Sequence, residues 1–171
     1  LNISGSATIN GNMSIGGSIN VSGTTTLANL TVDGDATFNG NLTVQDITVA
    51  NITVNGHIIT AGNTPTATVG TAAGTADIQN NIAAPQVTIE GNDTAGTITI
   101  VAGANTTAGD LAEIAFNAQF DIAPRAILSA KNANTASLQI FNSTQQNTLI
   151  IQTLNAPITG QTYTFDYIIV Q

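Results

Sequence analysis

The stretch "SIGGSINVSGTTTLANLTVDGDATFNGNLTVQDITVANITVNGHII", residues 14–59, repeats one short phrase with small variations. Each unit contains an aliphatic residue, a polar residue, often a glycine, and a Thr or Ser before the next aliphatic residue. We interpret a unit as a very short strand followed by a tight turn, where Gly accepts a positive φ. The leading aliphatic residues recur every five or six positions and begin upstream of the quoted stretch: Ile3, Ile9, Ile15, Val21, Leu27, Val32, Phe38, Val44, Val49, Val54 and Ile59.

One such unit is too small to be stable alone, so it needs either further coils of its own chain or other copies of the chain. A single chain would form a left-handed β-helix of about three coils, in which the five-residue steps would put the corners out of register. Three chains wound about one axis, each giving one strand per level, tolerate mixed spacing better. We therefore expect a homotrimeric β-helical stalk over residues 1–60, with the leading aliphatic residues as its threefold core.

Composition supports an all-β protein and excludes several classes of partner. Of 171 residues, 42% are hydrophobic and only 7% are charged, so the surface must consist mainly of Thr, Asn, Ser and Gln, which suit sheets. The net charge of −8 leaves no basic surface for nucleic acid or an anionic membrane. Cysteine is absent, and no apolar run approaches the roughly 18 residues that span a bilayer, so we expect no membrane insertion. Because the chain begins at Leu1, we expect a processed product or a fragment.

The pattern changes after the repeats. Residues 61–85 are rich in Gly, Pro, Ala and Thr and have no period, which predicts a neck, with a short helical turn at "ADIQNNIAA" (76–84). From Gln86 onward, alternating runs separated by turn residues predict an antiparallel β-sandwich head over residues 86–171. The expected strands are 86–90, 96–103, 111–117, 125–131, 136–142, 148–153 and 162–170. The expected core residues are Ile98, Ile100, Ile114, Phe116, Phe120, Ile127, Leu138, Ile140, Ile150, Phe165, Tyr167 and Ile169.

Several motifs resemble known fibre proteins. The series "GNDTAGTITI" (91–100), "IAFNAQFDIAPRAIL" (114–128), "NTLIIQT" (147–153) and "YTFDYIIV" (163–170) resembles the C-terminal heads of bacteriophage tail-fibre and bacterial surface-fibre proteins. The stalk motif "ATFNGNLTV" (36–44) is similar to repeats that precede such heads. The spacing of Phe116, Phe120 and Pro124 is distantly similar to that of the trimeric H-type lectin sandwiches. The resemblance implies a homotrimeric, extracellular or virion-borne fibre whose head contacts a surface glycan or another fibre component.

We expect binding to be carried by exposed polar loops on the head, because loops on a rigid sandwich adapt by hydrogen bonding. The candidate loops are "GANTTAGD" (103–110), "NANT" (132–135) and "STQQN" (143–147). Their candidate binding residues are Asn105, Thr106, Asn132, Asn134, Gln145 and Gln146. Arg125 and Lys131 share one predicted strand at even spacing, so they face the same side and could meet an anionic ligand or Asp77 of the neck. A solvated or intersubunit salt bridge is the expected role.

Catalysis finds little support in the sequence, and we expect no enzyme and no cofactor. There is no Cys nucleophile, no phosphate-binding loop and no Ser motif paired with the single histidine, His57. Three copies of His57 could meet at a trimer axis and bind a metal ion, but an outward-facing turn residue is the favoured interpretation. Asp110 with Glu113 is the acid pair that a glycan-cleaving tailspike would need. A second alternative is a self-polymerising filament subunit, since short strands leave edges open to strand addition.

Overall fold

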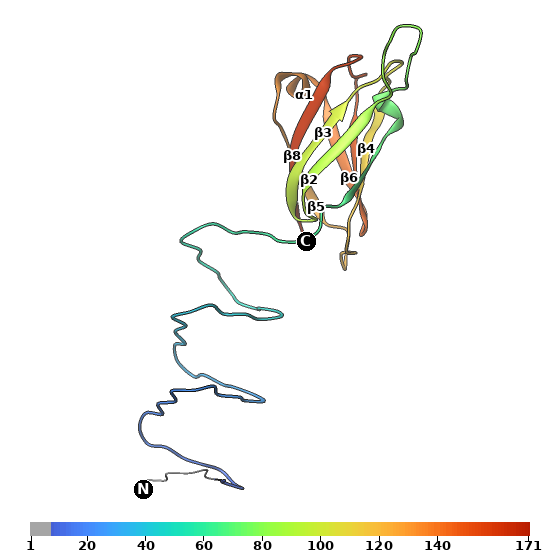
Figure 1. Cartoon of the computed structure of the whole chain (residues 1–171). Helices are drawn as coiled ribbons and strands as arrows, with labels where there is room; N and C mark the ends of the chain where they lie inside the picture. Colours follow the sequence, from blue (N-terminus) through green and yellow to red (C-terminus); the bar gives the residue numbers. More distant parts are fainter. Residues whose placement is uncertain (1–7) are drawn as a thin grey trace. The chain divides into compact units, whose positions relative to one another are not determined.

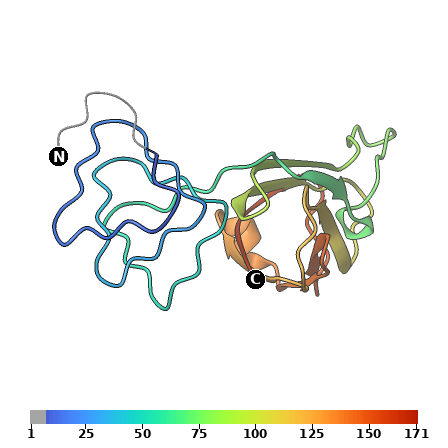
Figure 2. The same ribbon diagram turned by 90° about the horizontal axis from the view of Figure 1, so that it is seen from below.

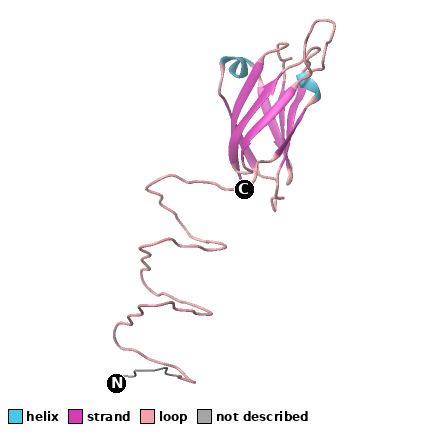
Figure 3. Ribbon diagram, in the orientation of Figure 1, coloured by secondary structure: helices cyan, strands magenta, loops and turns pink. Residues whose placement is uncertain are grey.

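The computed structural model describes residues 8–171 and is nearly all-β, with two antiparallel sheets and almost no helix (Figures 1 and 3). The chain divides into two compact units between Ile52 and Thr53. Ile3, the first expected stalk-core residue, lies outside the described residues.

The first unit winds through open turns without forming regular secondary structure (Figures 1 and 2). From residue 8 to residue 65 the described backbone forms no strand and no backbone-to-backbone hydrogen bond. Bends recur along the segment at or beside its glycines, including Gly11, Gly23 and Gly40. The bends lie where turns were expected, but none of the glycines from Gly11 to Gly56 adopts a positive φ, so that part of the prediction was wrong. The expected short strands between the bends do not form in the single chain.

The second unit contains a sandwich of two four-stranded sheets. One sheet has the order β1-β4-β7-β6, formed by β1 (Thr66–Val69), β4 (Gly109–Ala115), β7 (Thr148–Thr153) and β6 (Ile140–Thr144). The other has the order β2-β3-β8-β5, formed by β2 (Gln86–Gly91), β3 (Ala95–Val101), β8 (Thr162–Val170) and β5 (Arg125–Ala130). All neighbouring strands are antiparallel.

Part of the predicted neck belongs to the sandwich. Strand β1 pairs with β4 along its whole length, from Thr66 opposite Ala115 to Val69 opposite Ala112. The short 3-10 helix η1 (Thr71–Ala73) then places Ala72 and Ala73 in the core with no exposed surface. This stretch is rich in Gly and Thr, and its apolar residues are small. It therefore has no apolar periodicity from which the edge strand could be predicted.

The core lies between the two sheets and follows the expected alternation over most strands. Ile98, Ile100, Ile114 and Phe165 are fully buried. Phe116, Leu138, Tyr167 and Ile169 are also buried, and Phe120 and Ile140 pack against the core while partly exposed.

Two core predictions were wrong. Ile127 is 60% exposed, because β5 turns Ala126 and Leu128 inward instead. Ile150 is only half-buried, because Leu149 and Ile151 are the inward residues of β7. In both strands apolar residues occupy consecutive positions, so alternation alone does not fix which set faces inward.

The predicted strand at 136–142 is also corrected. Residues Ala133–Ser137 form the helical turn α1, and β6 starts only at Ile140. Asn132 begins the turn, since its side-chain oxygen accepts hydrogen bonds from the backbone N–H (2.8 Å) and hydroxyl (2.8 Å) of Thr135. A side-chain cap of this kind favours helix over strand at the residues that follow.

Candidate functional site

The largest set of chemically notable side chains is the row of aliphatic residues in the first unit. Its members lie every five or six residues and remain exposed, with Val44 at 50% and Phe38 at 58%. The exposed leading residues are Ile9, Ile15, Val21, Leu27, Val32, Phe38, Val44 and Val49, and Val54 and Ile59 continue the row in the second unit. Exposed large apolar residues this numerous and regular are typical of an interaction surface.

The head presents loops at its two ends, and the predicted binding loops do not share one end. The loops around Asn105 and Asn132 lie at the end where β8 begins, the apical end, as the bonds from Thr106 to the Pro157 carbonyl and from Asn132 to the Thr162 carbonyl show. Gln145 and Gln146 lie in the β6–β7 turn at the opposite end. The structure therefore separates "STQQN" (143–147) from the other two loops.

Most of the candidate binding residues already hold the head together. The Asn132 amide donates to the Thr162 carbonyl (3.2 Å) and the Thr164 hydroxyl (3.3 Å), in addition to capping α1. The Asn134 amide donates to the Gln161 side chain (2.8 Å). Gln146 accepts from Gln119 (3.1 Å) and donates to the Asp121 carbonyl. Their first role is to order loops, so they are less available to a ligand than sequence reasoning suggested.

The other three candidates make fewer hydrogen bonds within the head: Asn105, Thr106 and Gln145. Asn105 is exposed at a positive φ of 53° and donates to the Thr75 hydroxyl (3.3 Å). The Thr106 hydroxyl donates to the Pro157 carbonyl. The exposed Gln145 engages through its backbone N–H, which donates to the Thr148 carbonyl (2.9 Å). Among the six candidates, the side chains of Asn105 and Gln145 are the freest to meet a partner.

Sequence reasoning missed an apical hairpin within "ADIQNNIAA". Instead of a helical turn, Asp77 and Ile82 exchange two backbone hydrogen bonds of 2.9 and 2.8 Å, and Asn81 adopts a positive φ of 56°. Hydrogen bonds from the Asn80 side chain and backbone hold the pKa of the Asp77 carboxyl below its usual value. Ile78 projects from this hairpin with 91% of its surface exposed, and the loop extends beyond the strands (Figure 1).

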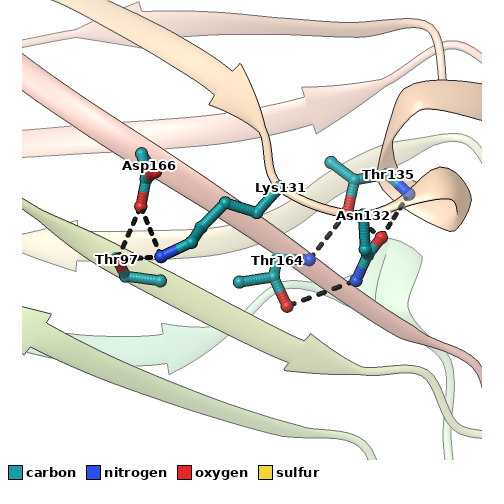
Figure 4. A network of polar contacts seen from close by, with 6 residues as sticks. All are labelled: Thr97, Lys131, Asn132, Thr135, Thr164 and Asp166. Atoms are coloured by element: carbon teal, nitrogen blue, oxygen red, sulfur yellow. Dashed lines mark hydrogen bonds and ion pairs between the residues drawn. The ribbon is translucent and has the colours of Figure 1, made fainter.

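One face of the β2-β3-β8-β5 sheet carries a compact polar network (Figure 4). The Lys131 ammonium lies 3.2 Å from the Asp166 carboxylate, to which the Thr97 hydroxyl also donates (2.6 Å). The Thr97 bond, followed by Lys131, keeps the pKa of Asp166 low. Lys131 thus forms its salt bridge within the chain, with Asp166 and not with Asp77, whereas Arg125 has no carboxylate partner among the described residues.

At the end opposite the hairpin, the basal end, a set of amide side chains fixes the incoming chain to the sandwich. The Asn92 amide donates to the Thr60 carbonyl (2.9 Å), while its oxygen accepts from the N–H groups of Thr94 (2.9 Å) and Ala95 (3.1 Å). The Tyr167 hydroxyl donates to the Asn92 carbonyl from inside the core.

A second bond holds the same incoming segment three residues later. The Asn117 amide donates to the Asn63 carbonyl (2.8 Å) and to Asp93 (3.1 Å). Residues 60–63 are therefore attached to the head at two points. No sequence motif predicts this arrangement.

The described residues offer no assembled catalytic or metal centre. Asp110 accepts a hydrogen bond from Gln152 (2.7 Å), and both it and Glu113 are exposed on a flat sheet face. His57 is exposed, and nowhere in residues 8–171 do three or more His, Cys, Asp or Glu side chains gather around a possible metal position. The described part of the chain also contains no helix with the length and hydrophobicity that crossing a bilayer requires.

Comparisons with protein-family models, with curated proteins and with solved structures give no match to this chain.

Proposed function

We propose that the chain is a structural and adhesive fibre protein without enzymatic activity. Three copies associate through the repetitive segment into an extracellular or virion-borne stalk, and the sandwich forms the head that mediates attachment. The observation that carries this proposal is the periodic aliphatic row of the first unit, exposed along a backbone that forms no backbone-to-backbone hydrogen bonds over residues 8–52. Water is a poor environment for such a row, and equivalent copies supply what it lacks.

Association would satisfy the side chains and the backbone together. Each leading residue, such as Val44, would meet its equivalents near the axis, and fully burying one Val, Leu, Ile or Phe side chain is worth about 1.5–3 kcal/mol. The short strands between bends would gain partners from the other chains. Either gain alone is small, but the repeat sums them over many levels.

The apical end supports the adhesive part of the proposal. It combines the projecting Ile78 with exposed polar positions such as Asn105 on a sandwich that the core keeps rigid. Three copies would present three such ends, so modest affinity at each would still give useful avidity. A surface glycan or another fibre component is the partner that the fibre resemblance suggests.

Negative-stain images of the purified full chain test the fibre, and binding to a glycan array and to cells tests adhesion. We expect short rods carrying a knob, and array or cell binding that falls when Ile78 and Asn105 are both changed to Ser. Ile158→Ser, another exposed apical residue, is the matched control. Compact globules in the images would contradict the fibre, and rods that bind no surface would restrict the protein to a structural role.

A filament subunit is a second candidate, favoured by the outer edge of β2, which has no strand partner in its sheet. Such an edge accepts an added strand. The corresponding edge of β5 is less open, because the Asn142 amide (3.4 Å) and the Thr144 hydroxyl donate to its Ala126 and Pro124 carbonyls. Long filaments in the same images, lost on changing the exposed Thr88 of β2 to Lys, a residue that hinders strand addition at an edge, would favour this candidate over discrete rods.

A further inference from the structure

The two outer faces of the sandwich differ in charge, and each carries exposed apolar residues. We define the basic face as the outward side of β5 and β8 at the basal end: Arg125, Ile127, Ile168 and Val170. We define the acidic face as the outward side of the other sheet: Glu113 on β4, Ile150 on β7 and Phe141 on β6. We propose that the basic face of one copy packs against the acidic face of the next, in a closed ring of three heads. This inference rests on the trimer proposed above and specifies how its heads meet.

The basic face consists of apolar side chains around one cation, Arg125. Ile127 and Ile168 lie directly opposite each other across β5 and β8 and are 60% and 49% exposed. Val170, 47% exposed, lies opposite Arg125 in the next outward pair. A shallow hollow lined by Ile122, Arg125 and Val170 adjoins this pair. Directly opposed aliphatic pairs on a solvent face are unusual in a chain whose other outward positions on this sheet are mainly Thr and Ser.

The charge of Arg125 has no counterpart among residues 8–171 of its own chain. The chain has only two basic residues, and the structure pairs Lys131 with Asp166, the one ion pair within residues 8–171. Arg125 therefore remains the unpaired cation of a chain with net charge −8. An interface with a carboxylate of another copy would satisfy it, and Arg is the cation best suited to an interface ion pair.

The acidic face has the complementary composition. Glu113 is exposed and lies directly opposite Ile150, which is opposite Ser143 in turn. Phe141, 42% exposed, is the diagonal neighbour of Ile150 on the same face. Asp110 lies farther along β4 and is bonded to Gln152, so Glu113 is the acid left beside the apolar residues. No Lys or Arg occurs on this sheet, because both lie on or beside β5.

The two faces also lie near the same end of the sandwich. Ile168 is two residues from the basal end of β8, at Val170, and Ile150 is two residues from the basal end of β7, at Thr148. A threefold axis rotates copies without shifting them along the axis, so surfaces that meet must lie at equal height. The meeting surfaces must also differ, because a closed ring of three uses two distinct patches on each copy. The basic and acidic faces are distinct patches, and both lie near the basal end, as such a ring requires.

Cross-linking in the full chain tests this arrangement, since the sequence contains no cysteine and only engineered thiols react. Packed sheet faces lie about 10 Å apart, beyond a direct disulfide, so a short bismaleimide is the reagent. We expect the Ile150→Cys, Ile168→Cys double variant to give covalent dimers and trimers on a denaturing gel. Each single variant should stay monomeric on that gel. Cross-linking of Ile168→Cys alone would overturn the proposal, because it requires two copies of one face to meet.

Charge changes in the same double-cysteine background test the ion pair. Arg125→Glu should lower the cross-linking rate about tenfold, the change that about 1.4 kcal/mol produces, and adding Glu113→Arg should restore it. Arg125→Gln should lower the rate while Lys131→Gln, the matched control on the same face, leaves it unchanged. Failure of the double exchange to restore the rate would overturn the Arg125–Glu113 pairing.

Sedimentation equilibrium of the same samples separates this inference from the proposed function. Trimers that do not cross-link would overturn the packing of the heads and leave the fibre proposal standing. Monomers throughout would overturn both.

Discussion

The first unit and the head are built from the same kinds of residue and reach opposite outcomes. Both are rich in Ile, Val, Thr, Asn and Gly. In the head, Ile98 and Leu149 have no exposed surface, whereas in the first unit Leu30 is 68% exposed and Ile52 is 69% exposed. Composition therefore does not decide whether an apolar side chain is buried within its own chain.

The length of the alternating run makes the difference. Strands of the head run for four to nine residues and turn back onto one another, so two sheets close over a shared core. Units of five or six residues are interrupted by a turn before a second strand can pair with the first. Because units this short do not pair within the chain, we infer that their partners are other chains.

The largest expected effect comes from a charge in the aliphatic row. Val44→Asp would place one carboxylate per chain near the proposed axis, at a cost on the order of several kcal/mol for each buried charge. We expect loss of association, measured by sedimentation, while the thermal transition of the head remains. Thr43→Asp is the matched control, since the neighbouring side chain of an extended unit points the other way. Equal behaviour of the two variants would show that Val44 does not face a shared core.

The converse experiment breaks the head and leaves the first unit intact. Phe165 is fully buried between the sheets, so Phe165→Ala should lower the free energy of unfolding of the head by about 3–5 kcal/mol. Ile158→Ala, at a position 65% exposed, should change it by less than about 0.5 kcal/mol. Chemical denaturation followed by tyrosine fluorescence reports on this unit, because both tyrosines lie in β8. Loss of association in the Phe165→Ala variant would show that the two units are not independent.

The head core was predictable where long apolar runs alternate. Strands β7 and β8 lie at their predicted positions, and the inward residues of β3 and β8 agree with the pattern. The prediction failed at Ile127 and Ile150, where neighbouring residues are equally apolar and only the register with the opposing sheet decides which faces inward.

Contacts between distant residues were not predictable. Strand β1 is too short and too polar for its sequence to show a strand pattern. The hydrogen bonds from Asn92 and Asn117 to residues 60–63 join segments that are far apart in sequence. The candidate loops could be located, but their placement at two ends depends on strand order. Whether a loop amide serves a ligand or an internal bond, as Asn132 does, depends on neighbours that the local sequence does not name.

An alkaline titration sharpens the comparison by reporting on the head alone. Burial, and then the nearby Asp93 charge, raise the pKa of Tyr167 to about 12. The folded state therefore holds this proton more tightly than the unfolded state, so the stabilisation is complete below the ordinary value of 10.0 and is lost as the pH rises toward 12. Tyr167→Phe should flatten this decline in thermal midpoint between pH 10 and 12. It should also cost about 1–3 kcal/mol at neutral pH, because the Asn92 carbonyl loses its donor.

The smallest effect is expected at the surface network of Asp166. Hydrogen bonding from Thr97, and then Lys131, lowers the pKa of this carboxyl below 3.8, so its contribution is present above 3.8 and disappears as the pH falls below the lowered pKa. The thermal midpoints of wild type and Asp166→Asn should differ slightly at pH 6 and converge in stronger acid. A difference that persists at pH 2 would have to arise from packing.

Sedimentation equilibrium of the full wild-type chain tests most directly whether the first unit depends on other copies. We expect a single species of three times the chain mass of 17.3 kDa, at concentrations where the head is folded. A folded species of 17.3 kDa, unchanged as concentration rises, would contradict it, because the exposed aliphatic row would then be stable without any partner.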